Sequence, residues 1–208
     1  MSEAQSTKKA LAQAMKELMA QKAMSKISVG EIADSCGMSR KSFYYHFKDK
    51  YDLVNWIYYT EFVSTIQFKG NMDPWTIIQL ICDYFYDNRI FYTNAFQIEG
   101  QNSFRDYFAD VMTPVMEVVF QDLVRPQPHR DFFISFMVDS VRLAIIRWLK
   151  EGSTIPPKEF VRLMRQAVEG VALHVVDRMQ MEQRHRQAKQ KNLLHRDDHA
   201  AGPESGNT

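Results

Sequence analysis

The stretch VGEIADSCGMSRKSFYYHF, residues 29–47, contains two short helical patterns separated by a glycine. Ser28 and Glu31 have the Ser-x-x-Glu spacing of a capping box, in which each side chain satisfies a free backbone amide of the first helical turn. This spacing predicts a helix that begins near Val29. Gly37 can adopt the positive φ found where helices end, so this helix is expected to stop there.

A second helix is expected directly after the turn. Ser39 has a side chain suited to cap it. Phe43 and Phe47 are four residues apart and would point together toward a core, whereas Lys41 and Tyr45 would point to the opposite side. The polar groups of this helix are therefore expected to face away from the core.

Such a pair of helices can form a helix-turn-helix, whose second helix enters the DNA major groove and reads base edges while flanking groups bind phosphate. The residues whose donors suit base edges are Arg40, Lys41 and Ser42. The residues whose donors suit phosphate oxygens are Tyr44, Tyr45, His46 and Lys50, the last at a helix start that already favours an anion. The alternative is a small helical core with solvated charges and no ligand.

Three runs of sequence carry a resemblance to a known family. They are Ile27-Ser28-Val29 with Ile32-Ala33 before the turn, Cys36-Gly37-Met38-Ser39 in the turn, and Tyr44-Tyr45-His46-Phe47-Lys48-Asp49-Lys50 after it. On these residues, positions 7–69 resemble the TetR family of bacterial transcriptional regulators. Within that family, the run YHFKDKYDLVNWIYYTEF is similar to regulators associated with dihydroxyacetone kinase operons. Gly30 departs from good helix composition.

The resemblance implies an N-terminal three-helix DNA-binding domain followed by a helical ligand-binding and dimerisation domain. It implies a homodimer that binds a pseudo-palindromic operator, usually as a repressor, and responds to a small-molecule effector. A protein co-regulator, with activation as the outcome, is the alternative. The DNA contacts that the resemblance implies are Ser28, Ser39, Arg40, Lys41, Ser42, Tyr44, Tyr45, His46 and Lys50.

Charge is distributed unevenly along the 208 residues. Residues 1–52 carry nine Lys or Arg against six Asp or Glu, a balance of +3, so the remainder is −2 because the whole chain is +1. An anion-binding face is therefore expected near the N-terminus.

Composition indicates a globular protein of the cytoplasm. Hydrophobic residues make up 45% of the chain and charged residues 25%. No run approaches the roughly 18 apolar residues that a membrane span needs, and the N-terminus lacks the apolar core of a signal peptide. Cys36 and Cys82 form no paired or Cys-x-x-Cys arrangement, so neither a disulfide framework nor a zinc site is indicated.

The periodicity predicts an all-α fold with no strand of any length. Helices are expected over 7–21, 49–69, 74–88, 90–99, 103–123 (kinked or split at Pro114), 130–151 and 157 to about 185. Linkers are expected at 125–128 and 152–157. The domain boundaries that follow are 1–50 for the DNA-binding domain, 51–70 for a linking helix, 71–194 for the effector and dimerisation domain, and 195–208 for a disordered tail.

Aromatic and methionine side chains recur through residues 73–150 and could line a cavity for an effector. The candidate ligand-binding residues are Trp75, Phe91, Phe96, Tyr107, Met112, Met116 and Arg142. For each aromatic or methionine, plain core is the alternative. Arg142 lies in an otherwise apolar run and needs a partner, either Asp139 or an anionic ligand.

Catalysis and metal binding have no support in the sequence. His195 and His199 are spaced like a metal pair but lack a third ligand and lie in the expected tail. No nucleophile, paired-carboxylate or glycine-rich phosphate pattern stands out. The chain is therefore not expected to be an enzyme or to hold a cofactor.

Dimerisation is expected from two helices with long apolar faces. On 130–151 the face is Phe132, Phe133, Phe136, Val141, Ile145 and Trp148. On 157–180 it is Phe160, Leu163, Met164, Val168, Val171 and Val175.

Overall fold

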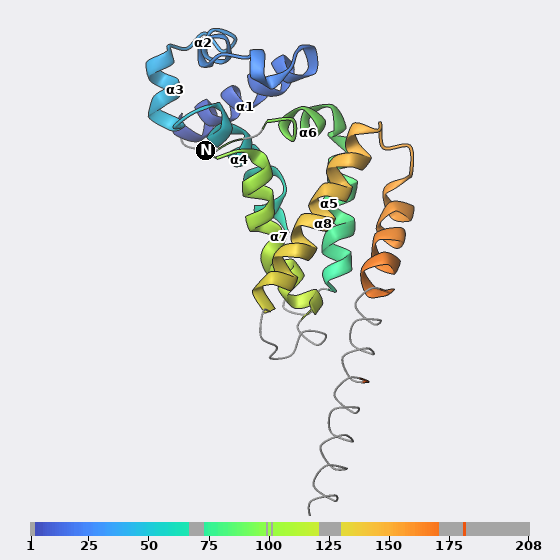
Figure 1. Cartoon of the computed structure of the whole chain (residues 1–208). Helices are drawn as coiled ribbons and strands as arrows, with labels where there is room; N and C mark the ends of the chain where they lie inside the picture. The colour runs from blue at the N-terminus through green and yellow to red at the C-terminus, as the bar shows by residue number, and fades with distance from the viewer. Residues whose placement is uncertain are drawn as a thin grey trace, which may run out of the picture. The chain divides into compact units, whose positions relative to one another are not determined.

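The regular elements of the chain are helices throughout the residues described, as the sequence predicts. The computed structural model describes residues 3–66, 73–98, 100, 102–120, 130–170 and 181. The elements are α1 (Glu3–Gln21), the 3-10 turn η1 (Met24–Lys26), α2 (Val29–Asp34), α3 (Arg40–His46), α4 (Lys50–Glu61), the 3-10 turn η2 (Val63–Thr65), α5 (Pro74–Asp87), α6 (Arg89–Ala95), α7 (Phe104–Phe120) and α8 (Arg130–Lys150) (Figure 1). Residues 157–170 are also helical.

The N-terminal head consists of α1, α2, α3 and the start of α4 (Figure 1). Its apolar centre is fully buried and draws one or more residues from each helix, because each helix has a single apolar stripe. These residues are Leu11, Met15, Ile32, Ala33, Phe43, Leu53 and Val54.

The first helix begins earlier than the sequence suggests. α1 starts at Glu3, whereas Thr7 was expected near its beginning. The Thr7 hydroxyl donates to the Glu3 carbonyl oxygen at 3.1 Å, a bond typical of a threonine inside a helix. Thr7 therefore lies within α1 and does not cap it.

The helix that leaves the head is shorter than predicted. α4 ends at Glu61, and η2 follows where a helix to residue 69 was expected. Ser64 and Thr65 donate side-chain hydrogen bonds to the carbonyl oxygens of Thr60 and Phe62, at 2.9 and 2.7 Å. Such bonds compete with the helical pattern of backbone bonds, so α4 gives way to a tighter turn.

The next three helices follow the predictions with changed ends. Asp73 accepts from the Thr76 amide and Pro74 begins α5, as the sequence predicts. α6 ends at Ala95, short of residue 99. α7 runs through Pro114 as one helix, so of the two predicted outcomes, a kink or a split, the split does not occur. Pro114 removes one backbone bond, a loss that packing of α7 against α5 and α8 offsets.

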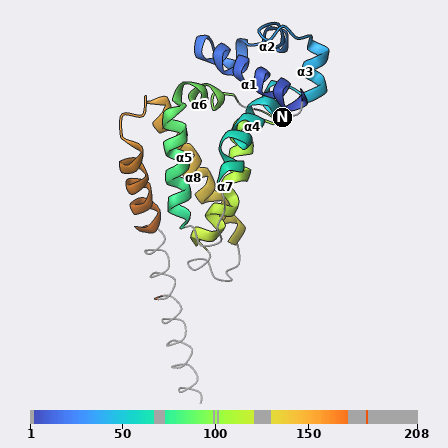
Figure 2. The same cartoon turned by 180° about the vertical axis from the view of Figure 1, so that it is seen from behind.

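The body is built around Tyr58 of α4, and α5, α7 and α8 run side by side next to it (Figures 1 and 2). Tyr58 is fully buried, and the centroids of seven other aromatic rings lie within 6.3 Å of its own. These rings are Phe62, Tyr84, Phe85, Tyr92, Phe104, Tyr107 and Phe108. The end of α4 is thereby packed into the body that it connects to the head.

Contacts divide the chain into two units, residues 1–165 and residues 166–208. Of the second unit, only 166–170 and 181 are described, and they are helical. The expected linker at 125–128, the tail at 195–208, His195, His199, Val171 and Val175 lie outside the described residues. No helix among those described has the length and apolar character that crossing a membrane requires.

Tyr58 and Tyr92 make a matched pair for testing the aromatic core. Among the described residues the Tyr58 hydroxyl is buried without a hydrogen-bond partner, whereas the Tyr92 hydroxyl donates to that of Tyr84 at 3.0 Å. Replacing Tyr58→Phe should raise the free energy of unfolding by about 1 kcal/mol, because it removes an unsatisfied polar group, and Tyr92→Phe should lower it by about 1 kcal/mol. Urea unfolding measures both, and equal destabilisation by the two changes would contradict this account of the core.

Candidate nucleic-acid interface

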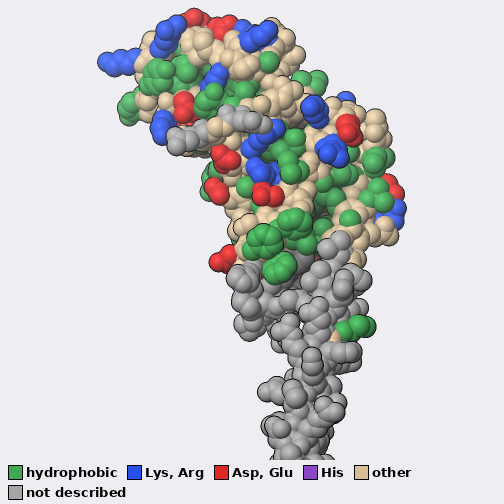
Figure 3. Space-filling model, in the orientation of Figure 1, with side chains coloured by type: hydrophobic (Ala, Val, Ile, Leu, Met, Phe, Trp, Pro, Cys, Tyr) green, Lys and Arg blue, Asp and Glu red, His purple; other side chains and the backbone are tan. Residues whose placement is uncertain are grey.

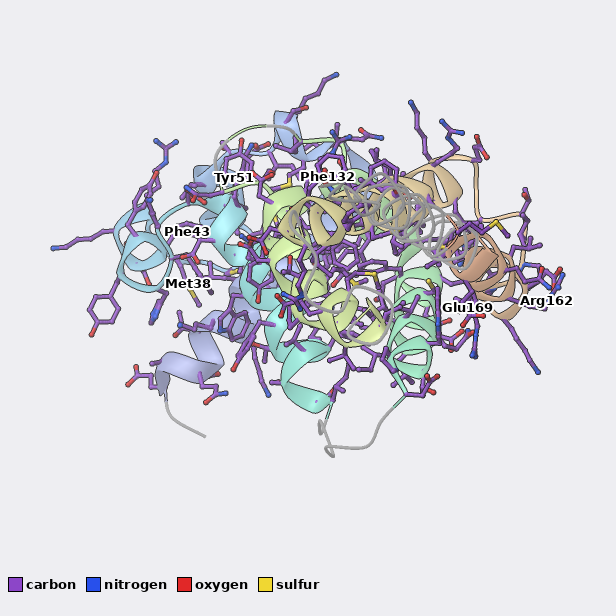
Figure 4. All side chains as sticks on the ribbon, turned by 60° about the horizontal axis from the view of Figure 1, so that its bottom comes forward. Met38, Phe43, Tyr51, Phe132, Arg162 and Glu169 are labelled. Carbon is purple, nitrogen blue, oxygen red and sulfur yellow. The ribbon has the colours of Figure 1, made fainter. Side chains whose placement is uncertain are left out.

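The two sides of α3 have opposite character. Phe43 is fully buried and Phe47 nearly so, whereas the Tyr45 side chain is 84% exposed. Figure 4 shows Phe43 on the side of α3 nearest α4, while other side chains of α3 extend outward. The predicted inward placement of Phe43 and Phe47 is confirmed, and the outward side carries the polar groups.

The structure brings most of the predicted DNA contacts onto one surface. Five of the nine line a shallow hollow of about 590 Å³ on the outer side of α3, namely Ser39, Lys41, Ser42, Tyr44 and Tyr45. His46 is half-buried, and its ring packs edge-on against Tyr45 with centroids 5.0 Å apart. Lys and Arg side chains project from this end of the molecule in Figure 3. The surface combines cations with hydroxyl donors, the two kinds of group that bind phosphate.

Both helices of the pair begin with the predicted caps. Ser28 Oγ accepts from the Glu31 amide at 3.2 Å while Glu31 Oε2 accepts from the Ser28 amide at 2.9 Å, which completes the capping box. Ser39 Oγ accepts from the Ser42 amide at 3.1 Å. The hydroxyls of Ser28 and Ser39 therefore fix the starts of α2 and α3, and both residues are exposed at those starts.

Glu31 also ties α2 to α1. Its carboxylate pairs with the Lys22 ammonium in addition to the Ser28 amide. The Lys22 hydrogen bond, followed by those from Ser28, lowers the pKa of Glu31 to about 2. The carboxylate is thus ionised at neutral pH and completes the cap as a charged acceptor.

The packing of Arg40 explains why a glycine, a poor helix former, is found at position 30 inside α2. Gly30 is buried under the side chain of Arg40, and a Cβ at this position would lie 2.6 Å from Arg40 Nη2 and 2.7 Å from Arg40 Nε. Since non-bonded atoms do not approach so closely, any larger residue would push the guanidinium away. Gly30 therefore lets Arg40, the first residue of α3, lie across the start of α2.

Lys50 has a role that the sequence did not indicate. Its Nζ donates to the carbonyl oxygens of Met24 and Ile27 at 2.8 and 2.7 Å, and burial lowers the pKa of this ammonium. Two of its three donors are thus used inside the head. Lys50 is thus a structural tie from α4 to η1 with one donor to spare, and its contact with phosphate stays a prediction.

Most of the residues predicted to line an effector pocket are buried side chains. Phe96, Met112 and Met116 are buried, and the Phe96 ring packs against Phe85 and Phe104 with centroids 5.5 and 4.8 Å apart. Trp75 and Phe91 are buried as well, and Tyr107 packs on Tyr58. These residues form the core that was the alternative reading of the sequence.

Arg142 has the internal partner that the sequence suggested. Its Nη2 lies 2.7 Å from Asp139 Oδ1, one helical turn away on α8. Two further hollows lined by described residues lie elsewhere and include none of the seven candidate ligand residues. One is lined by residues of α1, α6 and the end of α8, and the other by residues of α8 and the segment up to Phe160. Among the described residues no cluster of His, Cys, Asp or Glu could hold a metal ion.

Sequence reasoning missed a direct contact between α1 and α6. The predicted connection from the head to the rest of the chain was the helix after residue 49. In the structure α6 also packs on α1, and Asn94 hydrogen-bonds the segment where α1 ends. A single Asn between aromatic residues gives no sequence signal for such a contact, since its partners are backbone atoms about 70 residues earlier.

Two family models match separate parts of the chain. Residues 10–57 match the family model described as bacterial regulatory proteins, tetR family, and residues 73–170 match that of a transcriptional regulator C-terminal region. The chain is 31% identical over 103 residues to the HTH-type dhaKLM operon transcriptional activator DhaS of Lactococcus lactis subsp. lactis (strain IL1403). That match covers 49% of this chain and 54% of the relative, so the chain spans about half the length of this curated relative.

Solved structures share the fold at low sequence identity. A dihydroxyacetone kinase operon activator, DhaS, has a TM-score of 0.54 at 23% identity over 82% of this chain and 96% of its own. NalD of Pseudomonas aeruginosa, a secondary repressor of the MexAB-OprM multidrug efflux pump, has a TM-score of 0.54 at 20% identity over 79% of this chain and 96% of its own. A tetR-family regulator from Streptomyces coelicolor has a TM-score of 0.56 at 15% identity over 99% and 93%.

The packing of Arg40 on Gly30 predicts that stability and DNA affinity separate in one variant. Gly30→Ala should leave the free energy of unfolding unchanged or raise it by up to about 1 kcal/mol, because alanine favours a helix. The displaced guanidinium should weaken binding to a duplex selected by the wild-type protein by about 1–3 kcal/mol. Arg40→Ala supplies the control background, in which Gly30→Ala should have no further effect on affinity. An equal loss in both backgrounds, measured by fluorescence anisotropy, would show that Arg40 is not involved.

Proposed function

The chain belongs to the TetR family of bacterial regulatory proteins, and from this premise we propose that it binds a pseudo-palindromic operator as a homodimer and thereby regulates transcription. One observation carries the proposal. α3 buries Phe43 and Phe47 and turns Lys41, Tyr44 and Tyr45 outward on a surface rich in donors. Tyr44 and Tyr45 are 58% and 84% exposed, and hydroxyl donors exposed beside cations suit a phosphate backbone.

The place of each residue along α2 and α3 indicates whether it would contact base edges or phosphates. Arg40 and Lys41 are at the start of α3, the end of a recognition helix that reaches base edges in helix-turn-helix proteins. Tyr44 and Tyr45 come one turn later, where hydroxyl groups can reach phosphates on the groove wall. Ser28 and Ser39 are exposed at the starts of α2 and α3, where helix N-termini favour an anion.

The proposed partner for dimerisation is a second copy of this chain, docked on α8. Phe132, Phe136 and Leu143 are 65%, 54% and 57% exposed and share one face of the helix, and the rings of Phe132 and Phe136 stack on each other. Figure 3 shows a cluster of hydrophobic side chains on the lower part of the described surface, where α8 begins in Figure 1. Exposed clusters of large hydrophobic residues mark protein interfaces.

The face available to a second copy differs from the one that the sequence suggested. Val141, Ile145 and Trp148 are buried within the same chain, and Trp148 stacks on Phe160 with centroids 4.6 Å apart. These residues were expected in the interface but are buried in the chain's own core, and Trp148 holds the following helix on α8. The exposed stripe is rotated from them, and a hollow of about 380 Å³ that includes Leu143 and Ile155 continues it. Leu163, 40% exposed, adds an apolar group from the following helix.

Two directions of regulation are candidates, repression and activation. A repressor released by a small molecule is the outcome usual in the family. The second candidate is an activator controlled by a protein partner, and the burial of Phe96 and Met112 among neighbouring side chains supports it. The relatives named DhaS are described as activators, which is consistent with the second candidate.

Two substitutions on α3 test DNA binding. Lys41→Ala should reduce discrimination between a selected duplex and random DNA by about 1–3 kcal/mol, because a base-reading cation is lost, whereas Tyr45→Ala should weaken both alike. Lys150→Ala, an exposed charge at the end of α8, is the matched control and should change neither. Unchanged binding in both α3 variants, with the helical content intact by circular dichroism, would remove α3 from the DNA interface.

A second pair of substitutions tests the dimer. Phe132→Ser with Phe136→Ser should weaken the free energy of dimerisation by about 2 kcal/mol or more, because central aromatic residues dominate such interfaces. Ile90→Ser, a similarly exposed side chain at 63% on α6, is the control and should leave the dimer intact. Analytical ultracentrifugation at micromolar concentration measures the effect. A wild-type monomer, or a double variant that dimerises like the wild type, would contradict the proposed interface.

A further inference from the structure

Asn94 of α6 uses its whole side-chain amide on the backbone of the head. Its Oδ1 accepts from the Met24 amide at 2.8 Å. Its Nδ2 donates to the carbonyl oxygens of Met19 and Lys22 at 3.1 and 2.9 Å. One side chain thereby fixes both the last turn of α1 and the start of η1.

The bonds to the carbonyls satisfy groups that every helix leaves open. Met19 and Lys22 lie at the end of α1, where the last carbonyl oxygens have no donor within the helix. An amide is the only neutral side-chain group that offers two donors and an acceptor in one plane. Aspartate has nearly the same shape, but it would turn an oxygen toward the two carbonyl oxygens that now receive hydrogen bonds.

The segment held by Asn94 is also held from the other side. Lys50 at the start of α4 donates to the carbonyl oxygens of Met24 and Ile27, and Ser28 then caps α2. Met24 is thus bound through its amide to α6 and through its carbonyl to α4. The hydrogen bonds that Asn94 makes to Met19, Lys22 and Met24 form a clamp on this segment. Four residues of chain separate Met24 from α2, which leads directly into the turn before α3.

A second polar link joins α1 to the body and shares α6 with the first. Lys16 Nζ donates to Glu61 Oε1 at 2.6 Å, Tyr84 donates to Glu61 Oε2 at 3.0 Å, and Tyr92 of α6 donates to Tyr84 at 3.0 Å. Figures 1 and 2 show α6 beside the head in both views. α6 therefore connects to α1 at two points. The middle of α6 connects through this chain of hydrogen bonds, and the end of α6 connects through Asn94.

We propose that Asn94 is a positioning residue that locks the head to the body and so sets the separation at which the two heads of a dimer read their half-sites. This inference rests on the proposed function. Two recognition helices must enter successive major grooves about 34 Å apart, so a head that tilts by a few ångströms loses one set of contacts. Asn94 touches no DNA and acts only through the orientation of the head.

The test compares Asn94→Asp with Gln97→Glu. Gln97 lines the same hollow as Asn94 and is exposed, so the second variant adds the same charge there without touching the clamp. The probe is a duplex that the wild-type protein selects from a random library, together with versions that carry one or two base pairs inserted between the half-sites. A duplex with a single half-site completes the set.

Asn94→Asp should bind the intact selected duplex about tenfold more weakly than the wild type, yet bind the single half-site equally well. Insertion of base pairs should reduce wild-type affinity about tenfold or more but affect Asn94→Asp about threefold or less, because a loosened head can adjust to the new separation. Gln97→Glu should match the wild type in every measurement. Parallel losses on the half-site and on the full duplex would show that Asn94 is merely structural and would overturn the inference.

If Asn94→Asp does not fold, Asn94→Ala is measured in the same way, and hydrogen exchange at the Met24 amide gives a reading without DNA. Loss of its acceptor should speed that exchange about tenfold or more, and unchanged exchange would show that the clamp does not hold in solution. A wild-type protein that selects no duplex would overturn the proposed function and this inference with it. A wild-type protein that selects a duplex while Asn94→Asp keeps the same spacing preference would overturn the inference alone.

Discussion

The burial of Phe43 and Phe47 in the head is the constraint on which the rest of the interface depends. α3 has seven residues, too few to be stable as an isolated helix. Its orientation is set by Phe43, fully buried against the other helices, and by Phe47, which packs near Trp56 of α4. With that side fixed, the opposite side must carry Lys41 and Tyr45 outward. The reading surface is thus a consequence of apolar packing behind it.

The body shows how aromatic residues that suggest a pocket can pack against one another as core. Tyr58 is enclosed by rings from α5, α6 and α7 and by Phe62 just after α4, and edge-to-face and tilted arrangements fill the space between them. Burial of the Tyr58 hydroxyl among these rings raises its pKa well above its usual range, as expected for a hydroxyl far from water.

Helix starts were predictable from the sequence where the capping interaction joins residues only a few positions apart. The capping box at Ser28 and Glu31, the Ser39 cap and the Asp73-Pro74 start of α5 are all confirmed, because each depends on groups within one helical turn. The helix ends at Glu61 and Ala95 were missed. After Glu61 the competing bonds come from the Ser64 and Thr65 hydroxyls, and after Ala95 they are backbone turn bonds, so neither end is marked by a capping residue in the sequence.

The sequence by itself determined that the chain is helical, that its head has a polar outer side on α3 and which residues stand there, since periodicity and caps are local properties. Only the tertiary structure decided that the aromatic residues close into a core, that Val141 and Ile145 face inward while Phe132 and Leu143 stay exposed, and that Lys50 and Asn94 bind backbone carbonyls of the head. The physical reason is the same in each case. Carbonyl oxygens and ring faces have the same chemistry at every position. Which of them contacts a given side chain therefore depends on the folded path of the chain and cannot be read from the sequence pattern.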